Sequence, residues 1–242
     1  RSGVSRQNRL VDRHEGGGTS YYWKSYDFRA RRAKSNLNRF PLGPVFEGNP
    51  YPAQAFIHDG GEMIFGLPNG LQAYYLTDGV GKRIDEGPTD VVSDALKTSG
   101  TPAIVNGLSC AHCHKHGMIP FVDTVRDGKA LWGKPADKVE LLYPEAKVMA
   151  AKVKEDEERF VQALEKIIGP FVQVEEDAKR PIRDFLNPTG VSARRYLLSD
   201  LDAQMAAAEV GIKDTAELVA AIKVSKKLQL LGLQPLANGK LI

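Results

Sequence analysis

The sequence predicts an α+β fold, with a small antiparallel β region in the N-terminal part and a mainly helical unit in the C-terminal part. Short apolar runs separated by turn residues fill residues 55–85. Beyond residue 144, apolar residues instead recur at helical spacing over long segments. We therefore expect a β-rich region over 1–100 and a mainly helical region over 101–242, and the two could form one continuous domain.

The clearest strand signal lies in residues 55–85. Asn69-Gly70 separates two apolar runs, and Asp78-Gly79 marks a second turn. This pattern predicts a sheet of two or three antiparallel strands. The aromatic segment 19–28, TSYYWKSYDF, is predicted as a further strand because aromatic residues suit a pleated surface.

Helical signals dominate the second half. A short helix is expected at about 89–97, and the segment 122–131 is compatible with another. The strongest helix is predicted between Pro144 and Gly169, because proline favours the first turn of a helix and glycine its end.

Two more helices are predicted near the end of the chain. They begin at Ser199 and Asp214, since each of these residues is followed three positions later by an acidic residue, in the manner of a capping box.

Composition narrows the function. The 242 residues are 42% hydrophobic and 26% charged, with a net charge of +3, and no dense cluster of Lys and Arg predicts nucleic-acid binding. No apolar run is long enough to span a bilayer. Because the chain starts at Arg1 and ends abruptly, we expect the native polypeptide to be longer.

Both cysteines of the chain lie in the segment Cys110-Ala111-His112-Cys113-His114. The pattern C-x-x-C-H is typical of covalent haem c attachment. Each thiol adds to one vinyl group of the porphyrin, and the two intervening residues let both sulfurs reach one edge of the ring. The following imidazole is carried under the iron as the proximal ligand. The sequence thus predicts one covalent haem c held by Cys110 and Cys113, with His114 on the iron.

Three other interpretations of the motif are weaker. A disulfide between Cys110 and Cys113 would not need His114. A zinc site could add two of the motif's histidines (His112, His114 and His116), but zinc sites usually take their second ligand pair from a distant segment. A thiol-redox motif would normally lie between a strand and a helix of a βαβ unit.

Residues 110–114 resemble the haem-binding signature of c-type cytochromes. Residues 21–28, 58–76 and 106–120 are also similar to segments of large secreted planctomycete-type proteins with a single cytochrome c region. The resemblance implies a monohaem cytochrome c-like protein, periplasmic or extracellular, that belongs to a larger polypeptide or complex. The position of the motif departs from small class I cytochromes, where it follows the first helix near the N-terminus.

The sixth iron ligand decides the function, because two strong axial ligands favour electron transfer whereas an open position allows ligand binding or catalysis. His58 is the leading candidate, since Gly60 and Gly61 would permit close approach to a flat cofactor. The alternatives are Met149 and Met63. His112, His116 and Met118 are too near His114 in sequence to reach the opposite face of the porphyrin easily. His14 and Met205 have less support.

Other haem contacts can be suggested only from sequence proximity. Donors to the propionates could be Arg126, Lys115, Tyr75 and Trp132. Trp23 and Tyr26 could pack on the porphyrin, although ordinary core packing explains both.

The favoured function is an electron-transfer cytochrome that works with a redox partner protein. An alternative is a haem enzyme or small-ligand binder with an open iron site, in which the acid or base would be Glu62, Asp59, His58 or Arg13. A third possibility is a scaffold module stabilised by its haem. Motifs for dinucleotides, nucleoside triphosphates or a zinc protease are absent from the sequence.

Overall fold

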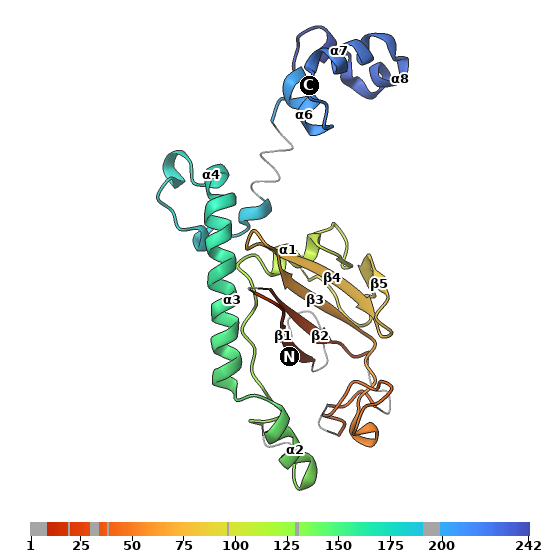
Figure 1. Ribbon diagram of the computed structural model, residues 1–242, viewed down its shortest axis with the longest axis vertical. Helices are drawn as coiled ribbons and strands as arrows, with labels where there is room; N and C mark the ends of the chain where they lie inside the picture. Colours follow the sequence, from red (N-terminus) through yellow and green to blue (C-terminus); the bar gives the residue numbers. More distant parts are fainter. Residues whose placement is uncertain are drawn as a thin grey trace. The chain divides into compact units, whose positions relative to one another are not determined.

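The computed structural model describes residues 9–18, 20–29, 34–37, 39–95, 97–128, 131–190 and 199–242. The chain divides into two compact units, residues 1–191 and 192–242. The α+β prediction is confirmed, with an antiparallel sheet followed by helices (Figure 1). The observed division differs from the one expected near residue 100, because the sheet and the long helix after it pack together in the first unit.

The first unit is built on a five-stranded antiparallel sheet whose strands follow one another in chain order. The strands are β1 (Leu10–Glu15), β2 (Tyr21–Tyr26), β3 (Gly60–Gly66), β4 (Gln72–Asp78) and β5 (Arg83–Ile84). The strands predicted in segments 55–85 and 19–28 are confirmed. Gly70 ends the turn between β3 and β4 with a φ of 85°, which explains the glycine there. A smaller sheet pairs β6 (Glu86–Gly87) with β7 (Ile104–Val105).

The helices of the first unit are mostly short, apart from one long helix. They are η1 (Pro52–Gln54), α1 (Leu108–Cys113), α2 (Lys134–Leu142), α3 (Ala146–Ile167), α4 (Gly169–Val172), η2 (Glu175–Asp177) and η3 (Ile182–Asp184). Helix α3 confirms the helix predicted between Pro144 and Gly169.

The two weaker helix predictions are wrong within the described residues. Residues 89–95 form turns and loop, and so do residues 122–128. In the second segment the Asp123 carboxylate accepts hydrogen bonds from the backbone N–H groups of Val125 and Arg126, at 2.7 and 2.9 Å. Such side-chain bonds offer the backbone an alternative to the helical pattern.

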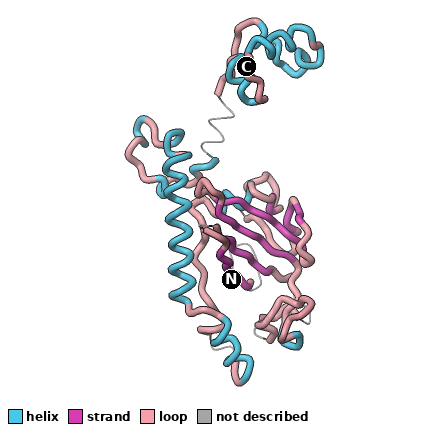
Figure 2. The backbone as a smooth tube through the Cα atoms, in the orientation of Figure 1, coloured by secondary structure: helices cyan, strands magenta, loops and turns pink. Residues whose placement is uncertain are grey.

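Helix α3 lies beside the sheet (Figure 2). A buried carboxylate fixes the helix to the sheet. Asp156 is 0% exposed and accepts hydrogen bonds from Trp23 Nε1 and Arg13 Nε, both at 2.8 Å. Around this contact, Trp23 and Ile64 of the sheet pack with Val153 of α3. The ion pair is satisfied on both sides, so a charge can remain in the core.

The second unit is a small helical body with its own core. It contains α6 (Ala203–Glu209), α7 (Thr215–Val224), α8 (Lys226–Leu228), the π-helix η4 (Gln229–Leu233) and α9 (Gln234–Ala237). Asp214 caps α7 as predicted. The helix expected at Ser199 begins later, because Asp202 caps it. The core is formed by buried side chains from α6, α7 and α9, namely Ala206, Ala207, Leu218, Ile222 and Leu236.

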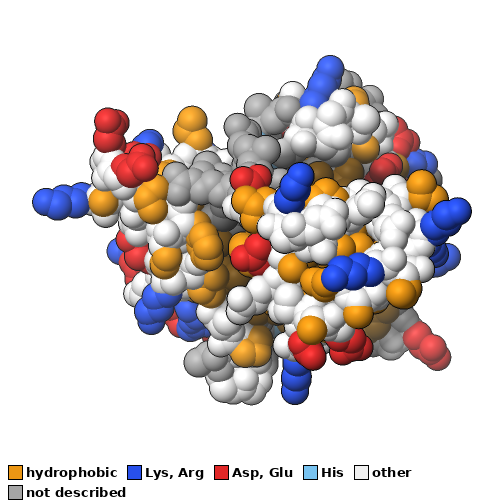
Figure 3. Space-filling view, turned by 90° about the horizontal axis from the view of Figure 1, so that it is seen from above, with side chains coloured by type: hydrophobic (Ala, Val, Ile, Leu, Met, Phe, Trp, Pro, Cys, Tyr) orange, Lys and Arg blue, Asp and Glu red, His pale blue; other side chains and the backbone are white. Residues whose placement is uncertain are grey.

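Two surface properties bear on function. Across the described residues, no helix combines the length and the apolar character needed to cross a membrane. The face in Figure 3 mixes positive and negative side chains with apolar ones rather than gathering a single sign of charge.

Candidate functional site

The cysteine motif forms helix α1, directly after strand β7. The helix starts after Gly107, whose φ of 79° suits glycine and lets the chain turn sharply. Cys110 and Cys113 are three positions apart in this helix, so both thiols lie on the same side of it. Neither cysteine forms a disulfide.

His114 ends helix α1 and its ring is held by the following turn. The ring atom Nδ1 lies 3.1 Å from the carbonyl oxygen of Gly117. Because a carbonyl can only accept, this partner assigns the proton to Nδ1 and leaves Nε2 turned away from the backbone. Histidines that bind metals usually donate their other ring nitrogen to a carbonyl or carboxylate in this way. His114 therefore has the support expected of a metal ligand at Nε2.

Glu62 of strand β3 faces the other side of the imidazole. Its Oε2 lies 3.7 Å from His114 Nε2, and the two side chains are 14% and 12% exposed. Burial alone would raise the pKa of Glu62. Interactions with His114 and with the Cys110 thiol outweigh burial and lower the pKa of Glu62 to about 2. Glu62 is thus a mostly buried carboxylate in contact with the histidine of the motif.

A cavity of about 1410 Å³ opens beside the motif. It exceeds the roughly 300–1,000 Å³ of ordinary small-molecule pockets. Cys110, Cys113 and His114 all line it. Three apolar side chains of the wall remain between 41% and 53% exposed, namely Ile119, Phe121 and Leu142. Exposed apolar walls of this kind suit a large, mostly apolar ligand that would cover them.

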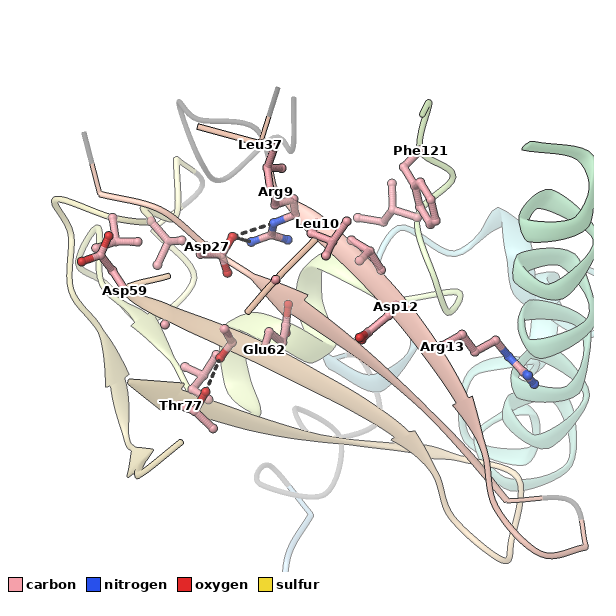
Figure 4. Close-up of a pocket in the computed structure, with 18 of the residues that line it drawn as sticks. Arg9, Leu10, Asp12, Arg13, Asp27, Leu37, Asp59, Glu62, Thr77 and Phe121 are labelled. Atoms are coloured by element: carbon pink, nitrogen blue, oxygen red, sulfur yellow. Dashed lines mark hydrogen bonds and ion pairs between the residues drawn. The ribbon is translucent and has the colours of Figure 1, made fainter. Parts of the chain in front are cut away.

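Charged residues gather at another part of the same cavity (Figure 4). Arg9 forms an ion pair of 2.6 Å with the buried Asp27, and Arg29 also lines the wall. The sequence pattern does not single out either arginine, because both come from a segment distant from the motif. Their only sequence signal is the basic character of the N-terminal region, which equally fits a solvated surface.

The geometry bears on the other interpretations of the motif. Among the described residues, no group of three or more His, Cys, Asp or Glu side chains is placed to hold a metal ion. Burial is the main cause of a raised pKa for both the Cys110 and Cys113 thiols. Thiol-redox motifs need a lowered pKa instead.

His58 does not reach the cavity. Its ring packs against Tyr26 and Phe56, with ring centroids 5.0 and 6.2 Å away, and it is not one of the described residues that line the cavity wall. Burial in this aromatic cluster lowers the pKa of His58. His58, which the sequence favours as the sixth ligand, therefore packs in an aromatic cluster rather than facing the cavity.

The two methionine alternatives are placed differently. Met63 follows Glu62 on β3, and because successive side chains of a strand alternate, it points to the opposite face of the sheet. Met149 lies on the first turn of α3 and lines the cavity. Met118 also lines the cavity but is buried in the core with Trp23. Of the two, the structure brings only Met149 to the cavity that His114 lines.

The remaining suggested residues have other partners or positions. Asp59 accepts a hydrogen bond of 2.7 Å from the backbone N–H of Arg29. Arg13 is bound to Asp156, and Arg126 donates to two backbone carbonyls near α2. Five more are not among the residues of the described cavity wall, namely Lys115, Tyr75, Trp132, Trp23 and Tyr26. Met205 belongs to the second unit.

Gly117 gives a first testable prediction. Its φ of 107° suits glycine, and a Cβ there would lie 3.2 Å from Glu157 Cα. We expect Gly117→Ala to destabilise the first unit by more than about 1 kcal/mol, because the substitution meets both strain and crowding. Urea unfolding would measure this. Gly81→Ala is the matched control for φ alone, since Gly81 has a φ of 84° and open space around it. Equal losses in the free energy of unfolding for the two variants would contradict the steric crowding of a Cβ at Gly117.

The site is characterised from its own geometry. No family model, curated protein or solved structure matches this chain. The described residues define a class of site in which two thiols and an oriented imidazole share one large cavity, with a buried carboxylate in contact with the imidazole.

Proposed function

We propose that the chain is a monohaem c-type cytochrome that carries electrons. The proposal rests on the arrangement of three side chains. The His114 ring is held through Nδ1 by the Gly117 carbonyl, and the two free thiols of the same helix line the same cavity as this histidine. When bound, haem c would supply one-electron chemistry between the ferrous and ferric states of its iron.

The residues present fit such a group. Cys110 and Cys113 would form the thioether bonds, and His114 would bind the iron through Nε2. The exposed apolar wall would be covered by the porphyrin, while Arg9 and Arg29 could bind its propionates as charge-assisted donors. These residues would attach the haem, bind its iron and offer donors to its propionates.

We propose Met149 as the sixth ligand, in preference to His58. Its position on the cavity wall supports this choice, whereas His58 packs among aromatic rings. A His/Met pair favours a higher reduction potential than a bis-histidine pair.

The visible spectrum of purified protein, before and after carbon monoxide, tests the sixth ligand. We expect sharp low-spin bands that ignore carbon monoxide, because two protein ligands would fill both axial positions. Met149→Ala should become high-spin and bind carbon monoxide, whereas Met63→Ala, on the opposite face of the sheet, should keep the original spectrum. A low-spin Met149→Ala would contradict the assignment.

A second candidate function is a haem enzyme or small-ligand binder with an open iron site. The contact of 3.7 Å between Glu62 and His114 favours it, because a buried carboxylate beside the iron ligand could serve as an acid or base. The same spectrum separates the two functions. Carbon monoxide binding by the unmodified protein would favour the enzyme.

The proposal extends to location and partner. Bacterial haem c is attached outside the cytoplasmic membrane, so we propose that the protein lies in the periplasm or outside the cell. An electron carrier there needs a redox partner protein. Reduction of the isolated chain by a soluble donor in a stopped-flow experiment would support electron transfer over a scaffold role.

A further inference from the structure

The corner that follows helix α7 exposes large apolar side chains of the second unit. Val224, Leu230 and Leu231 are 86%, 88% and 67% exposed. Single exposed apolar residues are common on protein surfaces, but several in one short segment are the kind of patch that marks an interaction site. We call residues 223–232 the tip. In Figure 1 it lies around the label α8, at the end of the second unit far from α6.

Hydrogen bonds hold the tip in a fixed corner. Gln229 Nε2 donates to the carbonyl oxygens of Ile222 and Lys223, both at 3.0 Å, and so satisfies two carbonyls at the end of α7. Ser225 Oγ accepts from the backbone N–H of Leu228 at 3.3 Å and caps the next turn. The backbone that carries the exposed side chains is therefore ordered by its own contacts.

The same segment also supplies leucines to the core of the second unit. Leu228 and Leu233 pack against that core. Leu230 and Leu231 lie between them in the sequence and remain exposed. Because the flanking leucines are tied to the core, Leu230 and Leu231 cannot turn inward without breaking the corner. Whatever covers these two side chains therefore lies outside the second unit.

Positive charge accompanies these apolar side chains. Lys223, Lys226 and Lys227 of the tip are exposed. Between residues 218 and 242 the sequence contains four lysines and no Asp or Glu, whereas the segment 199–217 contains five acidic residues and one lysine. The uniform sign of the charge favours a negatively charged partner and opposes the pairing of two tips.

The composition of the tip favours a lipid surface over a protein. Protein interfaces are typically anchored by Trp, Tyr and Arg, and lysine is depleted in them. The exposed large side chains of the tip are instead aliphatic residues and lysines. Apolar side chains beside lysines are the combination that binds the interface of an anionic membrane.

We propose that the tip docks on an anionic lipid surface, with its three apolar side chains in the lipid and its lysines at the headgroups. Each lysine near such a surface contributes about fivefold to binding, so the docking is reversible and weakens as salt screens the charges. Docking by the second unit does not depend on haem in the first unit, and it goes beyond electron transfer.

Co-sedimentation of the full chain with vesicles tests this docking. Vesicles of phosphatidylcholine with phosphatidylglycerol should bind the chain more than about tenfold more tightly than phosphatidylcholine alone. Leu230→Ser/Leu231→Ser should weaken this binding more than about tenfold, because the apolar burial of both side chains is lost. Lys226→Gln/Lys227→Gln should weaken it about 25-fold, because two charges leave the headgroups.

The controls make the same changes elsewhere in the chain. Lys147→Gln/Lys154→Gln removes two charges from exposed lysines of α3 and should leave vesicle binding unchanged, because salt screens charges distant from the lipid. Val80→Ser replaces an exposed apolar side chain of the first unit and should also leave binding unchanged. All the replaced side chains are exposed, so each variant should keep the circular dichroism of the unmodified chain.

Three results would overturn docking on anionic lipid. The first is equal binding to the two kinds of vesicle, or no binding to either. The second is full binding by Leu230→Ser/Leu231→Ser, which would show adsorption through charge alone. The third is self-association of the full chain without vesicle binding, abolished by the same leucine substitutions, which would assign the tip to a second copy of the chain.

Discussion

Replacing both motif cysteines by serine is expected to abolish covalent haem. Cys110 and Cys113 are the chain's only thiols, so Cys110→Ser/Cys113→Ser has no other sulfur with which to form a thioether bond. The purified double variant should show the mass of the polypeptide alone and no haem absorbance after denaturation and extraction. The unmodified chain should carry one haem that survives the same extraction.

Two controls make this result specific. His112→Ala changes the motif between the cysteines without removing a thiol, and it should keep the haem. His58→Ala removes a ring that packs on Tyr26 and Phe56, and its effect should fall on stability rather than on attachment. Haem that stays bound to the double cysteine variant through denaturation would contradict the thioether assignment.

The second large effect is expected from Asp156 on α3. Asp156→Ala leaves Arg13 Nε and the indole N–H of Trp23 buried without their acceptor, while Arg13 keeps only its ion pair with the exposed Glu15. Breaking one side of a buried ion pair typically costs about 3–5 kcal/mol, so we expect a loss of that order in the free energy of unfolding of the first unit. Urea unfolding followed by tryptophan fluorescence would measure it.

The control for this prediction lies on the same helix. Glu158 is exposed and only 3.8 Å from Lys154, so Glu158→Ala should change the stability by less than about 1 kcal/mol. The double variant Arg13→Met/Asp156→Leu should lose less than Asp156→Ala, because it removes both charges and fills the space. Equal losses for Asp156→Ala and Glu158→Ala would show that the buried pair does not fix α3 to the sheet.

Turn residues and apolar spacing, which are properties of short segments, correctly predict several strands and the long helix. The turns around Gly70 and Gly79 correctly marked strands β3 to β5, and the helical spacing after Pro144 correctly marked α3. The prediction of a helix at 89–97 is wrong, because hydrogen bonds to residues outside this segment fold residues 89–95 into turns and loop. The backbone N–H of Asp94 bonds to the carbonyl of Pro102, and the Asp94 carboxylate accepts from Thr98.

The sequence predicts only those residues of the candidate site that stand together in one short segment. Cys110, Cys113 and His114 stand in one short motif, and all three line one cavity in the structure. Glu62 lies 52 positions before His114 and meets it only because β3 and α1 pack together, so its sequence context shows only an acid in a strand. The choice of His58 rested on neighbouring glycines, which in the structure serve close strand packing instead.

The ion pair between Arg13 and Asp156 also bears on the order of events during folding. The two residues are 143 positions apart, and the cysteine motif lies inside the long loop that their contact closes. Closing such a loop costs entropy before the contact repays it, and long-range contacts slow folding. A chain elongating from its N-terminus presents the complete motif before Asp156 exists. The cysteines are therefore synthesised while the sheet still lacks the helix that will fix its buried face.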